Sequence, residues 1–259
     1  MKQLNLLTML LFVSVALSAQ NYFIGHRGAS FLAPENTLFS VKLAWELGAD
    51  AAEIDIHLSS DNRVMVIHDA NTKRTSMGKS QLDVAESTSE QLRKIDVGTF
   101  KSKAFAGEKI PFIDEILQTI PEGKTLVIEI KCGPEVLPAL QKVINESGKI
   151  NQLVFISFGW ETILETQKVF AQNKCYYLKM LPFGLNRKMK LAAQNGLAGV
   201  NLYHGIVNKR IVRKAEKLDI EVLAWTVDDV KTAKKLNKLG VQKITTNRPK
   251  WLKDQLENN

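Results

Sequence analysis

The sequence predicts an α/β fold, namely a (β/α)8 TIM barrel with a small insertion after the second strand. Short apolar runs typical of β-strands alternate with segments of helical periodicity, and eight such strands are each followed by a helix. About 240 residues remain when the first 19 are set aside, which suits one barrel and is long for two compact domains. The hydrophobic content of 45% is enough to bury one large core.

Residues 1–19 have the pattern of a secretory signal peptide. One lysine precedes a mostly apolar stretch, and the small residues Ser18 and Ala19 end it. The stretch is shorter than the roughly 20 apolar residues that a membrane span needs. We therefore expect cleavage near Ala19, a mature domain over residues 20–259, and a periplasmic or secreted protein with no stable membrane anchor.

The predicted strands are short runs rich in β-branched and aromatic residues, bounded by polar or turn-forming residues. In chain order they cover residues 22–27, 51–58, 125–131, 153–158, 175–179, 198–202, 221–227 and 243–246. Asp61 and Asn62 form a turn after the second strand, and an apolar run at 64–68 extends that strand as a hairpin.

The predicted helices carry apolar residues at helical spacing. Asn36 or Thr37 can cap the first of them, and Gly48 can end it. In chain order the helices cover residues 37–47, 113–120, 135–147, 160–171, 186–194, 208–218, 229–239 and 249–257.

The segment over about 69–109 is polar, rich in Lys and Ser, and without clear periodicity. Inside a compact domain such a segment is more often a functional excursion than a linker, and it cannot be a regular βα connection. The alternative fold, an open doubly wound sheet, needs a G-x-G-x-x-G loop after the first strand. The sequence GHRGAS at 25–30 does not supply one.

Ionisable side chains stand at the ends of the first predicted strands, where hydrophobic periodicity does not explain them. They are His26, Arg27, Glu53, Asp55 and His68. Any one of them alone is as easily a surface residue, but active sites of such barrels form at the carboxyl ends of the strands. The five together therefore predict one site.

Three carboxylates in this set suggest a divalent cation. Side chains alternate across a strand, so Glu53 and Asp55 share one face with their carboxylates roughly 6 to 7 Å apart. Glu129 and Lys131 repeat this spacing in a later strand, although the two could also form a structural ion pair. Carboxylates without Cys or clustered His ligands favour Ca²⁺ or Mg²⁺ over zinc.

The remaining candidates have other chemistry. Arg27 and Lys131 can hold phosphate oxygens, and His26 and His68 are placed for proton transfer near neutral pH. Phe158 and Trp225 offer apolar surface for a substrate, although aromatic residues of a barrel more often belong to its core. We assign no role to His57 and His204, each of which is more easily explained as structural.

Charge and cysteine content add little. The formal charge of +8 becomes +7 when Lys2 leaves with the leader, which weakly favours anionic small molecules or membrane surfaces and indicates no nucleic acid. Export permits a disulfide between Cys132 and Cys175, but two buried free thiols are at least as consistent with their positions.

Four motifs in the first third of the chain resemble the glycerophosphodiester phosphodiesterase family. They are HRG at 26–28, PENT at 34–37, E-x-D at 53–55 and HD at 68–69. The likeness continues through RTSMGK at 74–79, IPFIDEIL at 110–117, E-x-K at 129–131, Ser157-Phe158 and residues 225–227. It departs at Thr246-Asn247, where the family commonly has Thr-Asp, so no acid can be assigned a role there.

The resemblance implies a metal-dependent hydrolysis of glycerophosphodiesters, such as deacylated phospholipids, to glycerol 3-phosphate and an alcohol. It also implies that the insertion lies over the active site and that the glycerol 2-hydroxyl attacks first, with direct attack by water as the open alternative. His26 and His68 are then base and acid, with the base favoured at 26. Two other functions stay open, namely phospholipase D-type cleavage of lysophospholipids and a non-catalytic secreted binding protein.

Overall fold

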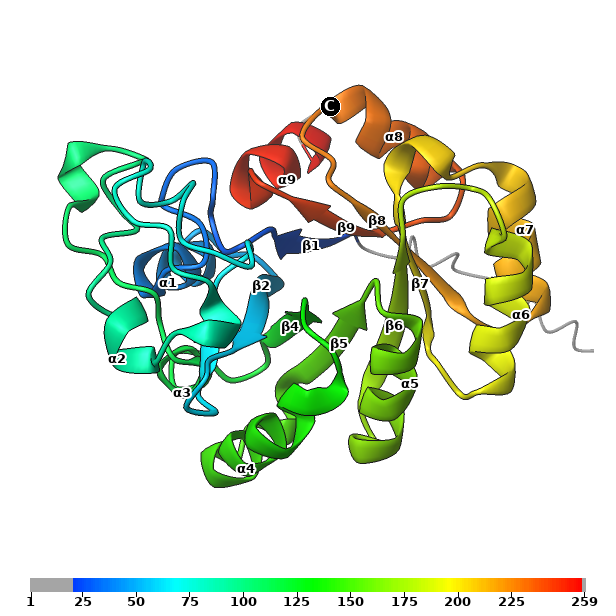
Figure 1. Ribbon diagram of the computed structural model, residues 1–259. Helices are drawn as coiled ribbons and strands as arrows, with labels where there is room; N and C mark the ends of the chain where they lie inside the picture. The colour runs from blue at the N-terminus through cyan, green and yellow to red at the C-terminus, as the bar shows by residue number, and fades with distance from the viewer. Residues whose placement is uncertain (1–20, 258–259) are drawn as a thin grey trace, which may run out of the picture.

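Eight parallel strands close into a barrel in the computed structural model, which describes residues 21–257 (Figure 1). The strands are β1 (Tyr22–Gly25), β2 (Ala51–Leu58), β4 (Thr125–Ile130), β5 (Leu153–Ser157), β6 (Lys174–Lys179), β7 (Gly199–Tyr203), β8 (Glu221–Trp225) and β9 (Lys243–Thr246). Their order is β1-β9-β8-β7-β6-β5-β4-β2, and β1 also pairs with β2, which closes the ring. The predicted (β/α)8 TIM barrel is confirmed.

Helices follow the barrel strands and surround them (Figure 1). They are α1 (Leu38–Glu46), α3 (Ile113–Leu117), α4 (Leu137–Ser147), α5 (Trp160–Val169), α6 (Leu185–Gln194), α7 (Lys209–Lys217), α8 (Val230–Lys238) and α9 (Pro249–Glu257). The predicted helix over 113–120 is too long, because α3 ends at Leu117 and Pro121 soon follows. The first strand was also predicted two residues too long. It ends at Gly25, since Arg27 has a positive φ of 54°.

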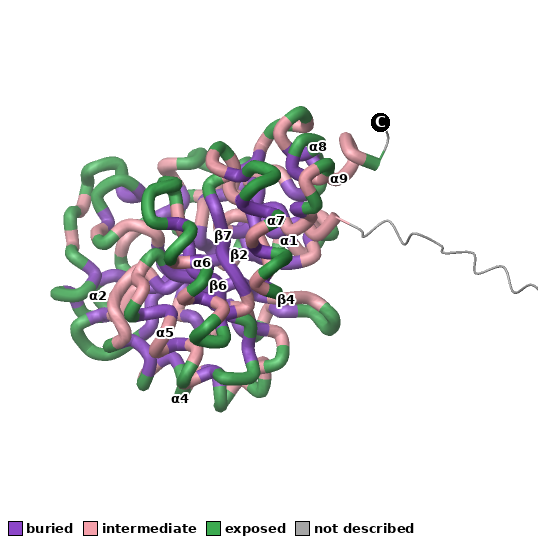
Figure 2. Tube along the Cα trace, turned by 90° about the vertical axis from the view of Figure 1, so that its right-hand side faces the viewer, coloured by how far each residue is buried: buried purple, intermediate pink, exposed green. Residues whose placement is uncertain are grey.

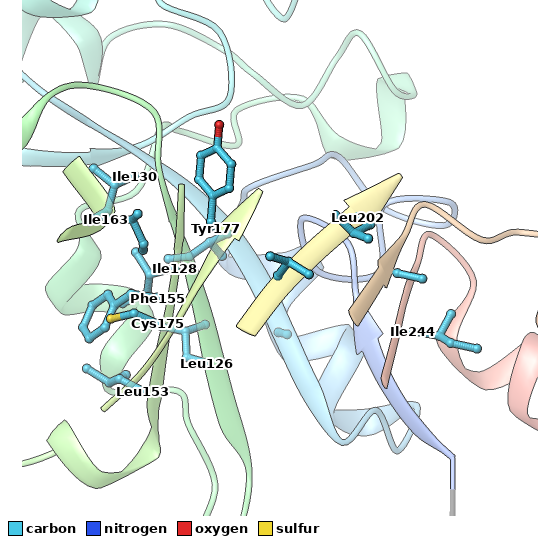
Figure 3. Packing of buried hydrophobic residues seen from close by; sticks show 14 of the residues in the cluster. Leu126, Ile128, Ile130, Leu153, Phe155, Ile163, Cys175, Tyr177, Leu202 and Ile244 are labelled. Carbon is cyan, nitrogen blue, oxygen red and sulfur yellow. The ribbon is translucent and has the colours of Figure 1, made fainter. Parts of the chain in front are cut away.

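The core has two layers because side chains alternate across each strand. Outward residues of the strands pack against the helices: Figure 3 shows Leu126, Ile128 and Ile130 of β4 beside Phe155 of β5 and Ile163 of α5. Inward residues fill the barrel itself, and the largest of these are Ile24, Ile156, Tyr176, Leu178 and Leu223. Figure 2 shows this buried centre enclosed by exposed segments. Each such aliphatic side chain contributes about 1.5–3 kcal/mol through burial.

The insertion after the second strand is present and folded. β3 (Val64–Val66) pairs antiparallel with β2 as the hairpin prediction requires, and η1 (Val84–Glu86), α2 (Ser89–Leu92) and η2 (Lys103–Phe105) follow before α3. Its apolar side chains form a small core of their own: Met65, Ile67, Val84, Leu92, Val97 and Ile110. In Figure 1 the insertion, coloured cyan to green, lies beside α1. Because it leaves the barrel at the carboxyl end of β2, the insertion stands next to the mouth of the barrel.

Both cysteines are free thiols, and burial raises the pKa of Cys132 to about 11 and that of Cys175 to about 12. None of the helices within residues 21–257 combines the length and the apolar character needed to cross a bilayer. The predicted signal peptide, residues 1–19, lies outside the described residues.

Candidate active site

A cavity at the carboxyl ends of the barrel strands brings together side chains that are far apart in the sequence. Eight of the nine predicted site residues line it, namely His26, Arg27, Glu53, His68, Glu129, Lys131, Phe158 and Trp225. The ninth, Asp55, is buried beside Glu53 and Glu129. Four lining residues were not predicted: Ile156, Leu178, Asn201 and Thr245.

The HRG motif makes a tight turn that delivers its side chains to the cavity. Arg27 and Gly28 both have positive φ, at 54° and 82°. A Cβ at position 28 would lie 2.6 Å from the backbone carbon of Ser40, so only glycine fits. The Arg27 amide donates to Glu53 Oε2 at 2.8 Å, and the Gly28 amide donates to the backbone oxygen of Glu53 at 3.1 Å. The turn is thus fixed to β2.

Glu53, Asp55 and Glu129 form a buried acidic cluster. Asp55 and Glu129 are opposite each other in the register of β2 and β4, and one carboxylate oxygen from each of the three acids lies within 4.8 Å of the others. Glu53 Oε1 and Asp55 Oδ1 have no hydrogen-bond partner. Burial and the neighbouring acids raise the pKa of Glu53 well above its usual value, and burial with Asp55 raises that of Glu129 to about 7. Oxygen donors that repel one another and lack partners fit a hard divalent cation.

Two basic side chains stand beside the cluster. Arg27 Nε lies 3.3 Å from Asp55 Oδ2, and Lys131 Nζ lies 2.8 Å from Glu129 Oε1 and 3.8 Å from Asp55 Oδ1. Burial favours a high pKa for Asp55, but the charges of Arg27, His68 and Lys131 outweigh it and lower the pKa. Glu129 and Lys131 therefore form the ion pair that the sequence left open as an alternative, and this pair is part of the acidic cluster.

The PENT motif supports this cluster from outside the cavity. Asn36, which adopts a positive φ of 57°, donates from Nδ2 to Asp55 Oδ2 at 2.8 Å and accepts from the Asp55 amide at 3.1 Å. Glu35 accepts from Arg27 at 2.9 Å, and Thr37 caps α1. The cap at Thr37 confirms one of the two predicted alternatives, whereas the contacts of Glu35 and Asn36 with the site were not predicted, although the motif itself was the signal that could have revealed them.

Arg74 connects the insertion to the site. It donates to both carboxylate oxygens of Glu35, at 2.9 and 2.6 Å, and from Nε to Asp69 Oδ2 at 2.7 Å. Asp69 Oδ1 in turn lies 2.7 Å from His68 Nδ1. Although burial opposes it, hydrogen bonds from Arg74 and His68 lower the pKa of Asp69 to about 2. One arginine of the insertion therefore holds the carboxylates that orient His68 and Arg27.

His26 is oriented by a different partner. Its Nδ1 lies 2.7 Å from Asn247 Oδ1, while Asn247 Nδ2 donates to Asp228 Oδ2 at 2.5 Å. A carboxylate only accepts, so the amide nitrogen must face Asp228 and the amide oxygen must face His26. His26 then carries its proton on Nδ1 and presents the lone pair of Nε2. Burial, and next the charge of Arg27, lower the pKa of this histidine.

The opposite wall of the cavity is aromatic. Phe158 and Trp225 meet edge to face with centroids 5.5 Å apart, and Tyr203 lies 5.9 Å from Trp225. Asn201 on β7 is 1% exposed, and its Oδ1 has no partner. A polar side chain between the apolar neighbours Val200 and Leu202 was the signal that the sequence offered for it.

The two histidines without an assigned role lie away from the cavity lining. His57 Nε2 lies 3.2 Å from the backbone oxygen of His68, so it supports the hairpin. His204 packs on Tyr203 with ring centroids 4.5 Å apart.

Phosphate esters are hydrolysed where positive charge meets the phosphoryl oxygens and where proton donors and acceptors flank them. The barrel mouth meets both conditions. The fold and the site therefore define a TIM-barrel enzyme of the phosphoric diester hydrolase class.

The chain belongs to the glycerophosphoryl diester phosphodiesterase family, whose family model matches residues 26–251. A glycerophosphodiester phosphodiesterase of Caldanaerobacter subterraneus is 31% identical over 234 residues, which cover 88% of this chain and 95% of that protein. The protein YhdW of Bacillus subtilis is 32% identical over 236 residues, covering 89% and 96%. Among solved structures, an Oleispira antarctica phosphodiesterase in complex with the product sn-glycerol-3-phosphate superposes with a TM-score of 0.84 at 24% identity, covering 92% and 97%.

Proposed function

We propose that this protein hydrolyses glycerophosphodiesters to glycerol 3-phosphate and an alcohol, with a divalent cation at Glu53, Asp55 and Glu129. The carrying observation is that a buried acidic cluster, two basic side chains and two separately oriented histidines share one cavity at the carboxyl ends of the strands. The relatives' names and the glycerol 3-phosphate held by the Oleispira enzyme support the substrate class.

The three carboxylates suit Ca²⁺ or Mg²⁺, because every donor is a carboxylate oxygen and two of the oxygens have no hydrogen-bond partner. A cation held there by Glu53, Asp55 and Glu129 would supply positive charge for the phosphodiester. Such a cation would offset the mutual repulsion of the carboxylates, and it would lower the raised pKa values of Glu53 and Glu129.

Arg27 and Lys131 bind the phosphoryl oxygens. Both line the cavity, and both are anchored at their other contacts to acids of the cluster, which fixes where their charge is presented. Fixed positive charge that needs no reorganisation stabilises the negative charge that develops during phosphoryl transfer.

His26 is the base. Its Nδ1 proton is committed to Asn247, its Nε2 is a free acceptor, and its lowered pKa keeps the ring neutral at physiological pH. It takes the proton of the attacking hydroxyl, which belongs either to the glycerol C2 position or to water. A cyclic glycerol phosphate among early products distinguishes the first of these from the second.

His68 is the acid. Its Nδ1 faces the Asp69 carboxylate, which can pair with a protonated ring, whereas the corresponding partner of His26 is a neutral amide. Lys131 Nζ lies 3.1 Å from His68 Nε2. A bound phosphate gives Lys131 an anionic partner instead, and this frees Nε2 to carry the proton that the departing alkoxide receives.

The aromatic wall receives the glycerol moiety. Phe158 and Trp225 cover its carbon atoms, and Asn201 Oδ1 accepts from one of its hydroxyls. The leaving alcohol lies towards His68 and the insertion.

The test is turnover of glycerophosphocholine, and separately of lysophosphatidylcholine, by purified protein with and without chelator. We expect glycerol 3-phosphate and choline from the first substrate, loss of activity with chelator, and recovery with Ca²⁺ or Mg²⁺. Glu46→Gln, on an exposed position of α1, is the matched control for substitutions in the cluster. If only lysophosphatidylcholine is hydrolysed, the activity is of the phospholipase D type. If neither substrate is hydrolysed, the proposed function is refuted.

A further inference from the structure

The large apolar side chains that are exposed in residues 21–257 all lie on one face of the barrel. Phe31 and Leu32 lie in the β1–α1 loop, and Met180, Leu181 and Phe183 lie in the β6–α6 loop. The others are Phe39, Met77, Phe158, Tyr203 and Trp251, each at a strand end, in the insertion, or in the first turn of a helix that follows a strand. All ten therefore lie towards the carboxyl ends of the strands, around the active-site mouth.

The β6–α6 loop is the most apolar part of this face. Phe183 is 90% exposed, Leu181 64% and Met180 50%. The loop is nevertheless held in place, because the Leu185 amide donates to Pro182 O at 3.1 Å and Leu185 itself is buried at the start of α6. A fixed loop that presents three adjacent apolar side chains to water indicates a surface that becomes covered.

The two apolar loops lie on opposite sides of the mouth. In the order β1-β9-β8-β7-β6, four steps separate β1 from β6, which is half the circumference of an eight-stranded barrel. A surface that contacts Phe31 and Leu32 as well as Leu181 and Phe183 must therefore span the mouth between them. Neither Leu181 nor Phe183 lines the active-site cavity, so the loop is not needed to complete it.

Positive charge flanks the same region. Lys179 and Arg187 bracket the β6–α6 loop, and a groove between α6 and α7 is lined by Lys190, Lys209, Arg210, Arg213, Lys214 and Lys217. The other residues of that groove, Asn186 and Leu218, are uncharged. Lys209 and Arg210 stand in the first turn of α7, at the end nearest the mouth. The complement of an apolar rim with a cationic flank is an anionic interface with an apolar interior.

We propose that the carboxyl face of this barrel docks reversibly on an anionic lipid bilayer. Leu181 and Phe183 insert among the headgroups, Phe31 and Leu32 contact the bilayer across the mouth, and the cations at the mouth ends of α6 and α7, namely Arg187, Lys209 and Arg210, pair with lipid phosphates. A second copy of this chain is the weaker occupant, because pairing two such faces brings two cationic flanks together. Docking places the active site against the surface from which deacylated phospholipids are released.

The test is sedimentation of the full chain with vesicles of phosphatidylcholine containing about one quarter phosphatidylglycerol, and with vesicles of phosphatidylcholine alone. We expect binding to the anionic vesicles that weakens as salt is raised. The variant Leu181→Ser/Phe183→Ser loses two inserted side chains and should bind about tenfold more weakly or worse. Ala171→Phe is the matched control, because it adds an aromatic residue at an exposed position on the opposite face and should leave binding unchanged.

The vesicle measurements test membrane docking independently of the proposed enzyme activity. The double Ser variant should hydrolyse soluble glycerophosphocholine as the wild type does, which also shows that it folds. Equal vesicle binding by the variant and the wild type, or no binding to anionic vesicles, would overturn docking. A wild-type dimer in light scattering that the variant loses would also overturn it and make a second copy the occupant. Vesicle binding without turnover of any diester would refute the proposed function and leave docking intact.

Discussion

Asn247 Oδ1 lies 2.7 Å from Nδ1 of His26, and the other end of the same amide donates to the carboxylate of Asp228. The carboxylate is therefore one amide away from the imidazole. The amide orients the imidazole and fixes which ring nitrogen carries the proton, but it places no negative charge beside the ring. His26 is thus held in the tautomer of a base while burial and Arg27 keep its pKa low.

Glu53→Gln should make the metal-free protein more stable and the enzyme inactive. A glutamine can still accept from the Arg27 amide, and its NH₂ group replaces the unpartnered Oε1 with a donor towards Asp55 and Glu129. We expect a gain of about 1–2 kcal/mol in the free energy of unfolding in chelator. Denaturant titration in chelator, with added Ca²⁺ as the second arm, measures it.

The same experiment tests whether Glu53 is a ligand of the cation. The wild type should gain stability on adding the cation, and the variant should gain little, together with a loss of at least about 10²-fold in turnover. Glu46→Gln should behave as the wild type in both arms. Full activity of the variant in the presence of chelator would show that the acidic cluster is not a metal site.

The barrel was predictable because it depends on short-range patterns that repeat, whereas the supporting contacts of the site were not. His26, Arg27 and Glu53 could be chosen because charged groups at the ends of apolar strands have no packing reason to be there. Asn36 and Asn247 could not, since asparagine is common in turns and its role here depends on partners 19 and 221 residues away. Contacts of that range exist only after the barrel closes.

The small core of the insertion was missed for a related reason. Its apolar residues, such as Val84 and Val97, are too sparse along the chain to show a helical or strand period. They pack together because Met65 and Ile67, at the end of the hairpin, provide a common surface.

Arg74→Met should reduce turnover without unfolding the protein. The substitution leaves Asp69 and Glu35 without their shared partner, so the carboxylates that orient His68 and Arg27 become mobile. Because Arg74 is half exposed, we expect stability to change by less than about 1 kcal/mol, while kcat falls about tenfold or more. Steady-state kinetics and a thermal melt measure the two effects.

Lys94→Met is the control for Arg74, since Lys94 forms an exposed ion pair with Glu90 on α2 of the same insertion. It should change neither kcat nor stability. Equal effects of the two substitutions on kcat would show that Arg74 acts by holding the insertion together and not by orienting His68.

Export is expected from the pattern of residues 1–19. Protein isolated from its native host should begin near Gln20 or Asn21, because the small residues Ser18 and Ala19 mark the cleavage site. Intact-mass spectrometry of the periplasmic and secreted fractions checks this. Recovery of the chain with Met1 from a cytoplasmic fraction would contradict it.

The two histidines should differ in how they respond to the leaving group. His26→Ala and His68→Ala should both be severely impaired on glycerophosphocholine, by about 10²- to 10⁴-fold. On a nitrophenyl ester of glycerol phosphate the departing group is a stable anion that needs no proton, so His68→Ala should recover substantially and His26→Ala should not. Rates of both variants on both substrates, relative to wild type, provide the measurement. Equal losses in all four combinations would mean that the histidines position phosphate and transfer no proton.

Exchanging the acid and the amide behind His26 should change the pH profile without changing the fold. In Asp228→Asn/Asn247→Asp the side chain at 228 can still accept from the Thr246 hydroxyl and the backbone amide of residue 247, and it can now donate to the carboxylate at 247. The net charge is conserved, but the carboxylate moves into direct contact with His26 Nδ1. A carboxylate there stabilises the imidazolium, which the present amide does not.

The sign of the change follows from the proposed role of His26 as a base. In the wild type its pKa is lowered, so activity should persist below pH 6.5 before the acid limb of kcat/KM falls. In the exchanged variant the pKa rises, and the acid limb should move to higher pH by about one pH unit. The single substitution Asn247→Asp places the new carboxylate and that of Asp228 at the distance of the present hydrogen bond. We therefore expect this variant to lose about 1–3 kcal/mol of stability. Asp219→Asn, at an exposed position far from the mouth, is the control and should leave the pH profile unchanged. If the acid limb does not move in the exchanged variant, the pKa of His26 does not determine that limb.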